Sequence, residues 1–151
     1  MNKKLMIISS SVVMLTILIV IFAFTAEGTG SKKQTRYSIT GTWQLDSYKY
    51  GSSSGSFTAI TPNRPHVKLI TAERFLWVTY DTTSKKLLES AGGAYTLDGE
   101  NYIEEIDFGY NMDTYLGSKS TFKIRVEDDI FYLSGTLSDG YKIEEVWTRI
   151  K

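Results

Sequence analysis

The chain has 151 residues, of which 42% are hydrophobic and 13% aromatic, with 17 basic and 17 acidic side chains and no net charge. The absence of cysteine excludes disulfides, thiolate metal sites, cysteine nucleophiles and a lipid attached to cysteine. The balanced charge provides no basic surface for nucleic acid, and the length suits one domain of ordinary size.

Residues 1–26 carry a targeting signal. A short basic head at residues 1–4 precedes residues 5–24, which contain no charge and are long enough to enter a membrane. The segment is either an uncleaved transmembrane anchor or a cleaved signal peptide. We therefore expect the domain that follows to be exported to the cell envelope. It is membrane-anchored if the segment stays, and secreted or periplasmic if the segment is cleaved. Residues 27–36 are polar and are interpreted as a flexible linker.

The predicted folded domain covers residues 37–151 and is all-β. Apolar and polar residues alternate in eight segments that are bounded by turn residues, which is typical of half-buried strands. The predicted strands are Gly41–Tyr50, Val67–Thr71, Arg74–Tyr80, Gly93–Leu97, Asn101–Phe108, Ser120–Val126, Ile130–Leu137 and Tyr141–Ile150.

Short turns between these segments predict the topology. Asp98-Gly99, Asp128-Asp129 and Asp139-Gly140 stand where two-residue hairpins need them. Strands that follow one another should therefore pair, giving an eight-stranded up-and-down antiparallel barrel. The longer stretch Gly51–Pro65 is expected to lie over one barrel mouth as a lid, with a short segment at Phe57–Ile60.

Two sets of motifs carry a family resemblance. Gly41-Thr42-Trp43, together with Arg149, resembles the calycin signature, in which a tryptophan packs across the closed barrel end beneath an arginine. Four further segments resemble a family of small bacterial lipocalin-like (calycin-type) β-barrel domains of unassigned function: Val67–Thr71, Arg74–Val78, Gly92–Leu97 and Lys142–Trp147. The resemblance covers Ile39 to Ile150. It implies a barrel in an exported or membrane-attached bacterial protein, and it brings no catalytic residues.

Strand alternation predicts which side chains face the interior. The expected inward residues are Trp43, Leu45, Ser47, Val67, Leu69, Phe75, Trp77, Tyr95, Leu97, Tyr102, Glu104, Ile106, Phe108, Phe122, Ile124, Val126, Ile143, Glu145 and Trp147. Gly41, Trp43 and Arg149 are interpreted as a structural clasp, whose loss should destabilise the fold without abolishing binding specificity.

Glu104 and Glu145 are the best candidates for polar recognition, because a buried carboxylate needs a partner or a raised pKa. The alternative is a water-filled or salt-bridged barrel without a specific ligand. Trp77, Tyr95, Tyr102 and Tyr132 are further candidate ligand contacts, although aromatic residues at strand spacing also serve as ordinary core.

His66 is expected to be an incidental surface residue, and one histidine without cysteine argues against a metal site. No cofactor is expected. Enzyme motifs are missing, so the chain is interpreted as a non-enzyme; the enzymatic alternative is a hydrolase that uses Glu104 and Glu145 as its two carboxylates.

The function that these features favour is a binding protein that holds a small, apolar or amphipathic molecule in the barrel. The alternative is a packed barrel that binds another envelope protein and has neither ligand nor catalysis. The two differ in the barrel interior, because a void of a few hundred Å³ suits carriage and a filled interior suits the interaction domain.

Overall fold

The computed structural model describes residues 38–51 and 55–151. The predictions for residues 1–26 and 27–36 lie outside the described residues, as do Tyr37 and residues 52–54 of the predicted lid. Within the described part of the chain, no helix is both long enough and apolar enough to span a membrane.

The described residues form nine strands and one short 3₁₀ helix. In chain order these are β1 (Gly41–Tyr50), β2 (Thr58–Ala59), β3 (His66–Ile70), β4 (Arg74–Tyr80), β5 (Leu87–Asp98), β6 (Asn101–Tyr110), η1 (Asp113–Tyr115), β7 (Lys119–Glu127), β8 (Ile130–Thr136) and β9 (Lys142–Ile150). The eight predicted strands are all present, and the one predicted from Gly93 begins at Leu87 instead. The two-residue strand β2 lies inside the short segment expected at Phe57–Ile60.

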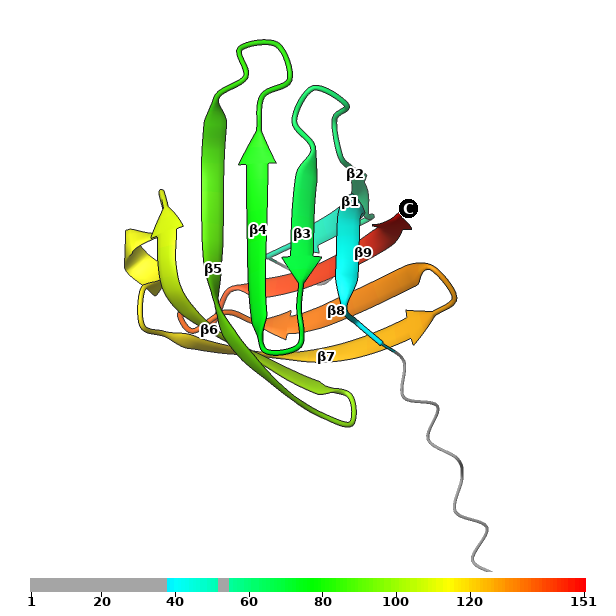
Figure 1. The fold of residues 1–151 in the computed structure, drawn as a ribbon, viewed down its shortest axis with the longest axis vertical. Coiled ribbons are helices and arrows are strands. Elements are labelled where there is room, and N and C mark those ends of the chain that lie inside the picture. The colour runs from blue at the N-terminus through cyan, green and yellow to red at the C-terminus, as the bar shows by residue number, and fades with distance from the viewer. Residues whose placement is uncertain (1–37, 52–54) are drawn as a thin grey trace, which may run out of the picture. The chain divides into compact units, whose positions relative to one another are not determined.

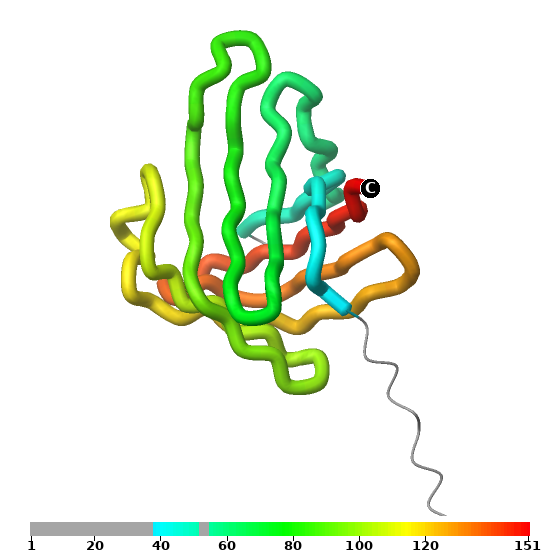
Figure 2. Tube along the Cα trace, in the orientation of Figure 1, coloured from blue at the N-terminus to red at the C-terminus, as the bar shows by residue number. Residues whose placement is uncertain are grey.

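Eight of these strands close into an antiparallel barrel, which confirms the predicted fold class. From β3 to β9 each strand pairs with the next, and β1 pairs with both β3 and β9. Figure 1 shows β3, β4 and β5 side by side, with β7, β8 and β9 running across them. The tube in Figure 2 follows the chain up and down through these successive hairpins. The strand β2 adds to the edge of β1, where Ser47 pairs with Ala59.

Two β-bulges change which side chains face the interior. In β1 the register shifts between Leu45 and Ser47, so the extra residue Asp46 reverses the alternation that follows. A second shift in the β5–β6 pair, between Gly92 and Gly93, leaves Phe108 with half of its surface exposed. The predictions that Ser47 and Phe108 face inward are therefore wrong.

Gly93 is required at the second bulge. A Cβ atom at this position would overlap the carbonyl oxygen of Glu105 on the neighbouring strand. Only glycine allows the two backbones to come this close. The Gly92-Gly93 pair thus marks the bend of β5 and does not form a nucleotide-binding loop.

The inward face of β3 is the opposite of the predicted one. Lys68 and Ile70 are buried, whereas Leu69 is 42% exposed. The tight turn after β3 pairs Ile70 with Phe75 and Lys68 with Trp77, and directly paired residues share a face of the sheet. The prediction that Val67 and Leu69 face inward is wrong for this reason. Leu97 is also largely exposed, since it lies at the end of the barrel where β5 turns into β6.

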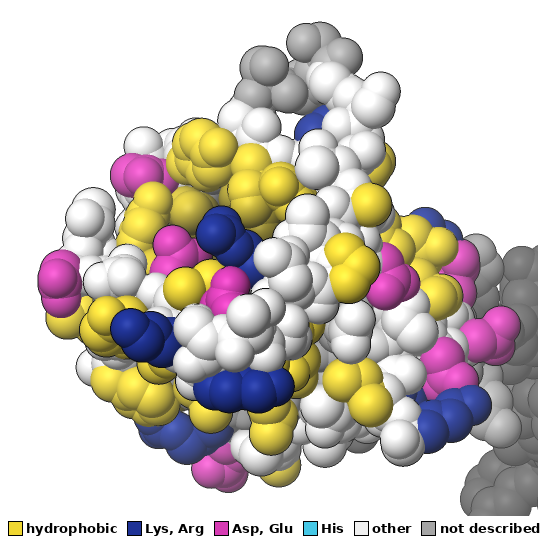
Figure 3. Space-filling model, turned by 90° about the horizontal axis from the view of Figure 1, so that it is seen from above, with side chains coloured by type: hydrophobic (Ala, Val, Ile, Leu, Met, Phe, Trp, Pro, Cys, Tyr) yellow, Lys and Arg dark blue, Asp and Glu magenta, His cyan; other side chains and the backbone are white. Residues whose placement is uncertain are grey.

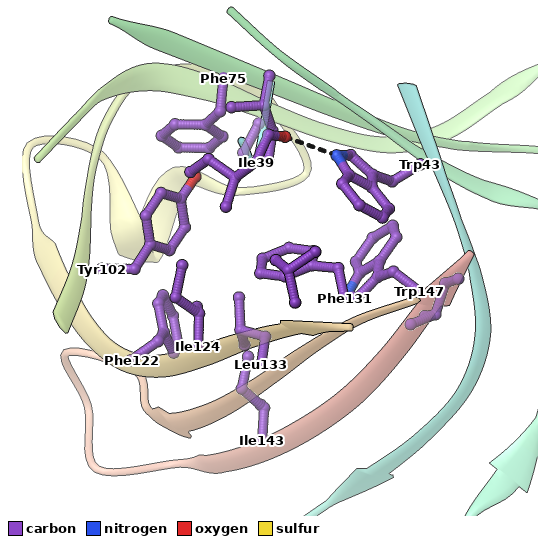
Figure 4. Packing of buried hydrophobic residues seen from close by; sticks show 14 of the residues in the cluster. Ile39, Trp43, Phe75, Tyr102, Phe122, Ile124, Phe131, Leu133, Ile143 and Trp147 are labelled. Carbon is purple, nitrogen blue, oxygen red and sulfur yellow. Dashed lines mark hydrogen bonds between the residues drawn. The ribbon is translucent and has the colours of Figure 1, made fainter. Parts of the chain in front are cut away.

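One half of the barrel interior is filled by hydrophobic side chains. We call it the packed end and define it by Trp43, Phe75, Tyr102 and Phe131, all less than 3% exposed. The rings of Trp43 and Phe131 lie 5.3 Å apart, and the indole N–H of Trp43 donates a hydrogen bond to the Ile39 carbonyl at 2.7 Å (Figure 4). This packing fixes the end of the barrel at which β1 begins.

Candidate functional site

Arg149 covers the packed end from outside. Its guanidinium lies 4.0 Å from the centroid of the Trp43 ring and donates hydrogen bonds to the carbonyls of Thr40 at 2.7 Å and Ser38 at 2.9 Å. Residue 41 has a φ of +144°, a backbone conformation that side chains with a Cβ atom rarely adopt, which explains the glycine there. Gly41, Trp43 and Arg149 thus hold the chain that enters the barrel, and they lie away from the cavity described below.

The other half of the barrel is hollow. It contains a cavity of about 700 Å³ that opens at the end opposite Arg149. Residues 58–61 of the predicted lid contribute to its wall, and Figure 3 looks onto this end, where hydrophobic side chains lie beside charges of both signs. The inner wall combines aromatic and aliphatic residues with buried polar ones, among them Leu45, Tyr48, Tyr50, His66, Lys68, Trp77, Glu104, Ile106, Ser120, Phe122, Leu133, Ile143, Glu145 and Trp147.

An ion pair separates the cavity from the packed end. The ammonium of Lys68 lies 2.5 Å from Oε1 of Glu104, and the two residues are only 2% and 5% exposed. The same ammonium lies 5.4 to 5.6 Å from the ring centroids of Phe75, Tyr102 and Trp147. Both charges are therefore neutralised by each other, and the lysine gains additional attraction from the aromatic faces.

Sequence reasoning missed Lys68, although a signal for it was present. Only Ala72 and Glu73 separate the predicted strands Val67–Thr71 and Arg74–Tyr80, so a two-residue turn pairs Lys68 with Trp77. Because Trp77 was expected to face inward, its partner had to do the same.

Glu145 is buried at the wall of the cavity, with two neutral hydrogen-bond donors. Its Oε1 accepts a hydrogen bond from the Tyr50 hydroxyl at 2.6 Å, and its Oε2 accepts one from the Trp147 indole at 3.1 Å. Burial raises the pKa of Glu145, and the charge of Lys68 opposes this increase. Burial, followed by the nearby Glu145 carboxylate, also raises the pKa of Tyr50, which keeps its hydroxyl protonated.

His66 also lines the cavity, so its prediction as a surface residue is wrong. Its ring lies between the indoles of Trp77 and Trp147, at centroid distances of 4.8 and 5.0 Å. Burial lowers the pKa of His66 to about 3, with a further contribution from the Lys68 ammonium. The imidazole is therefore neutral at physiological pH. Neither its Nε2 nor the Oγ of Ser120, which is 3% exposed, has a hydrogen-bond partner among the described residues.

Of the aromatic candidates, Trp77 lines the cavity and Tyr102 and Tyr95 do not. Tyr102 is completely buried in the packed end, with its ring 5.1 Å from that of Tyr95. The hydroxyl of Tyr95 donates to the carbonyl of Thr71 at 2.8 Å, so this side chain braces the turn between β3 and β4. The structure does not place Tyr95 and Tyr102, which were predicted as ligand contacts, in the cavity wall, because both residues lie at the filled end of the barrel.

Tyr132 faces the outside of the barrel. Its neighbours Phe131 and Leu133 are buried inside, and alternation along β8 turns Tyr132 to the opposite face. There its ring lies 4.1 Å from the guanidinium of Arg125. Tyr132, which was predicted as a ligand contact, is therefore not part of the cavity wall.

The buried polar groups suit non-covalent binding better than metal coordination. Residues 38–51 and 55–151 contain no group of three or more histidine, aspartate or glutamate side chains that could hold a metal ion. The cavity instead provides one ion pair, one carboxylate without a cation beside it, a neutral imidazole and a hydroxyl. These groups can orient a small molecule whose apolar part lies against the aromatic wall.

The closed eight-stranded barrel, packed at one end beneath Trp43 and Arg149 and hollow at the other, defines a lipocalin-like protein. More specifically, the chain belongs to the family described as Domain of unknown function (DUF4488), whose model matches residues 38–151.

Solved structures support the same fold. A lipocalin-like protein from Bacteroides uniformis superimposes with a TM-score of 0.53 at 21% identity, covering 74% of this chain and 97% of that one. An uncharacterized protein from Bacteroides eggerthii superimposes with a TM-score of 0.52 at 16% identity, covering 75% of this chain and 100% of that one. No curated protein matches the sequence.

Proposed function

We propose that the protein binds a small, largely apolar or amphipathic molecule in the barrel cavity. The observation that carries this proposal is the cavity of about 700 Å³, which lies within the size range of ligand pockets. Its aromatic wall suits an apolar body, and the buried polar groups suit one or two hydrogen-bonding anchors. A packed interaction domain would have this volume filled by side chains.

The binding domain is proposed to act in the bacterial cell envelope. Residues 5–24 would insert into the membrane and either remain as an anchor or be removed with a signal peptide. An envelope protein that contacts the outer face of the barrel is a partner that this location would allow.

Catalysis is not part of the proposal. A two-carboxylate hydrolase needs one carboxyl group as acid and a second that is free to act as base or nucleophile. Glu104 is held in the ion pair with Lys68, and Glu145 accepts hydrogen bonds from Tyr50 and Trp147. These contacts favour binding over bond cleavage.

The test is native mass spectrometry of the full chain, purified from the envelope of its own bacterium, followed by organic extraction. We expect one small molecule per chain, and identification of the extract would give its chemistry. A protein that is folded and empty, and that also binds none of the amphipathic probes described below, would contradict the proposal.

A further inference from the structure

The barrel interior contains one more acidic than basic side chain. Among the described residues, the charged side chains that are buried are Lys68, Glu104 and Glu145. Lys68 is paired with Glu104, and no lysine or arginine nitrogen of these residues lies within 4.0 Å of the Glu145 carboxylate. Buried charges are ordinarily paired, because an isolated one is costly to remove from water. Glu145 therefore lacks the cation that a buried carboxylate usually has.

The Glu145 carboxylate has room for another hydrogen-bond donor. A carboxylate offers about four acceptor positions. Tyr50 and Trp147 occupy two of them, one on each oxygen, and both are neutral donors. Because Glu145 belongs to the cavity wall, a donor of positive charge could reach it from the cavity.

The surroundings of Lys68 show how this barrel accommodates an ammonium group. Its nitrogen lies 5.6 Å from the Phe75 ring and 5.4 Å from the Trp147 ring, within the range of cation–π attraction. The cavity wall also contains the rings of Tyr50, whose hydroxyl contacts Glu145, and of Trp77. A cation that enters this cavity would thus find a carboxyl group and aromatic rings in one wall.

Two unpartnered polar atoms independently indicate a ligand with polar groups. Ser120 is 97% buried and its Oγ has no partner in the described residues. His66 is only partly exposed, and its Nε2 is a buried atom that also has no partner there. Both side chains line the cavity. Leaving a buried polar group unpaired is costly, so a ligand that forms a hydrogen bond with either atom would gain affinity there.

Resting on the binding function proposed above, we infer that the cavity takes a small amphipathic amine, whose protonated nitrogen pairs with Glu145 and whose apolar body lies against the Trp77 and Trp147 rings. Lys68 is the cation that faces this site from β3, and its charge is offset by Glu104 at 2.5 Å. At the cavity mouth, Arg64 and Glu89 contribute one charge of each sign. The wall as a whole thus has three carboxyl groups and two basic side chains, and this excess of carboxyl groups favours a cation over an anion.

Three probes with one aromatic body and different head groups test this inference. Isothermal titration calorimetry of the full chain would compare tryptamine, tryptophol and indole-3-propionate, which carry a positive, a neutral and a negative head. We expect tryptamine to bind at least about tenfold more tightly than tryptophol, as a charge-assisted hydrogen bond in a buried site provides. The propionate should bind most weakly.

The matched variants are Glu145→Gln and Glu144→Gln. Glu144 is the adjacent residue of β9, but it faces the outside, where it pairs with Lys49 at 2.7 Å. Glu145→Gln should weaken tryptamine binding by roughly tenfold to a hundredfold and leave tryptophol binding unchanged. Glu144→Gln should change neither. If Glu145→Gln does not fold, the three probes on the unaltered chain still decide the question.

The outcomes separate this inference from the function on which it rests. Equal affinities for tryptamine and tryptophol, or tryptamine binding that is unchanged in Glu145→Gln, would overturn the amine inference and leave the binding function in place. Tighter binding of indole-3-propionate would reverse the charge preference. If none of the three probes binds, the amine inference is wrong, and an empty extract in addition would remove the binding function itself.

Discussion

Lys68 and Glu104 form their ion pair across the barrel interior. They belong to β3 and β6, which are separated in the sheet by β4 and β5, and their charged atoms lie 2.5 Å apart. The pair lies where the packed end stops and the cavity begins. The contribution of this ion pair to the stability of the fold can be tested separately from the charge preference of the cavity.

Replacing one partner of the ion pair should lower the free energy of unfolding strongly, whereas replacing both partners with apolar residues should not. We expect Glu104→Gln to destabilise the fold by about 3–5 kcal/mol, because it leaves a buried ammonium without its counter-ion. Combining Lys68→Met with Glu104→Leu should recover most of that loss, as both desolvation costs then disappear. Urea denaturation of the full chain measures both free energies of unfolding.

The control for this prediction is Glu105, which follows Glu104 on β6 and points to the opposite face of the sheet. Glu105 pairs with Lys119 at 3.1 Å on the surface, with side chains 43% and 65% exposed. Glu105→Gln should cost no more than about 1 kcal/mol, because exposed ion pairs contribute little. Similar losses for Glu104→Gln and Glu105→Gln would show that the buried pair has no special importance.

Arg149→Ala should destabilise the protein without changing its ligand affinity. The substitution removes the stacking on Trp43 and two hydrogen bonds to backbone carbonyls, which together are worth about 2 kcal/mol or more. Arg125→Ala is the matched control, since Arg125 covers the Tyr132 ring at 4.1 Å on the open surface. Thermal unfolding would measure the difference, and a binding defect in Arg149→Ala would contradict a purely structural role.

His66 should make the fold sensitive to mild acid. Its pKa is lowered from 6.5 to about 3 by burial, so below pH 6.5 the unfolded chain binds a proton that the folded chain does not. Stability therefore falls as the pH decreases through this range, by about 2 kcal/mol between neutral pH and about pH 5. Urea denaturation at several pH values measures this slope.

His66→Gln should remove that part of the pH dependence. Glu145 acts in the opposite direction, because its raised pKa makes the folded chain bind a proton more strongly than the unfolded one. Its contribution is present in both proteins and cancels when their slopes are subtracted. Identical slopes for the unaltered chain and His66→Gln would mean that the imidazole is not buried in its neutral form.

Trp77→Ala should weaken ligand binding while the fold is retained. Trp77 lines the cavity and is partly exposed, whereas Trp43 is completely buried in the packed end. With tryptophol as the probe, we expect a clear loss of affinity in Trp77→Ala and only a modest decrease in melting temperature. Trp43→Ala should instead cost about 3–5 kcal/mol of stability. If Trp77→Ala unfolds the domain and shows no separate binding defect, Trp77 belongs to the core and not to the binding site.

The strands were predictable because they depend on local information. Alternation along Gly41–Tyr50 and the turn residues Asp98-Gly99 indicate where a strand runs and where it reverses, and short turns leave little choice of partner. Glu104 and Glu145 could be placed inside in the same way, from their apolar neighbours on β6 and β9. Both are buried in the structure.

The sequence by itself thus determined the eight strands, their order and two carboxylates of the interior. Only the tertiary structure decided that Lys68 and His66 face the cavity, that Tyr132 does not, and that half of the barrel is hollow. The physical reason is that alternation defines two faces of each strand without saying which one is inside. Cross-strand register and bulges, such as those at Asp46 and Gly93, make that choice, and the volume left over depends on how side chains from all eight strands meet.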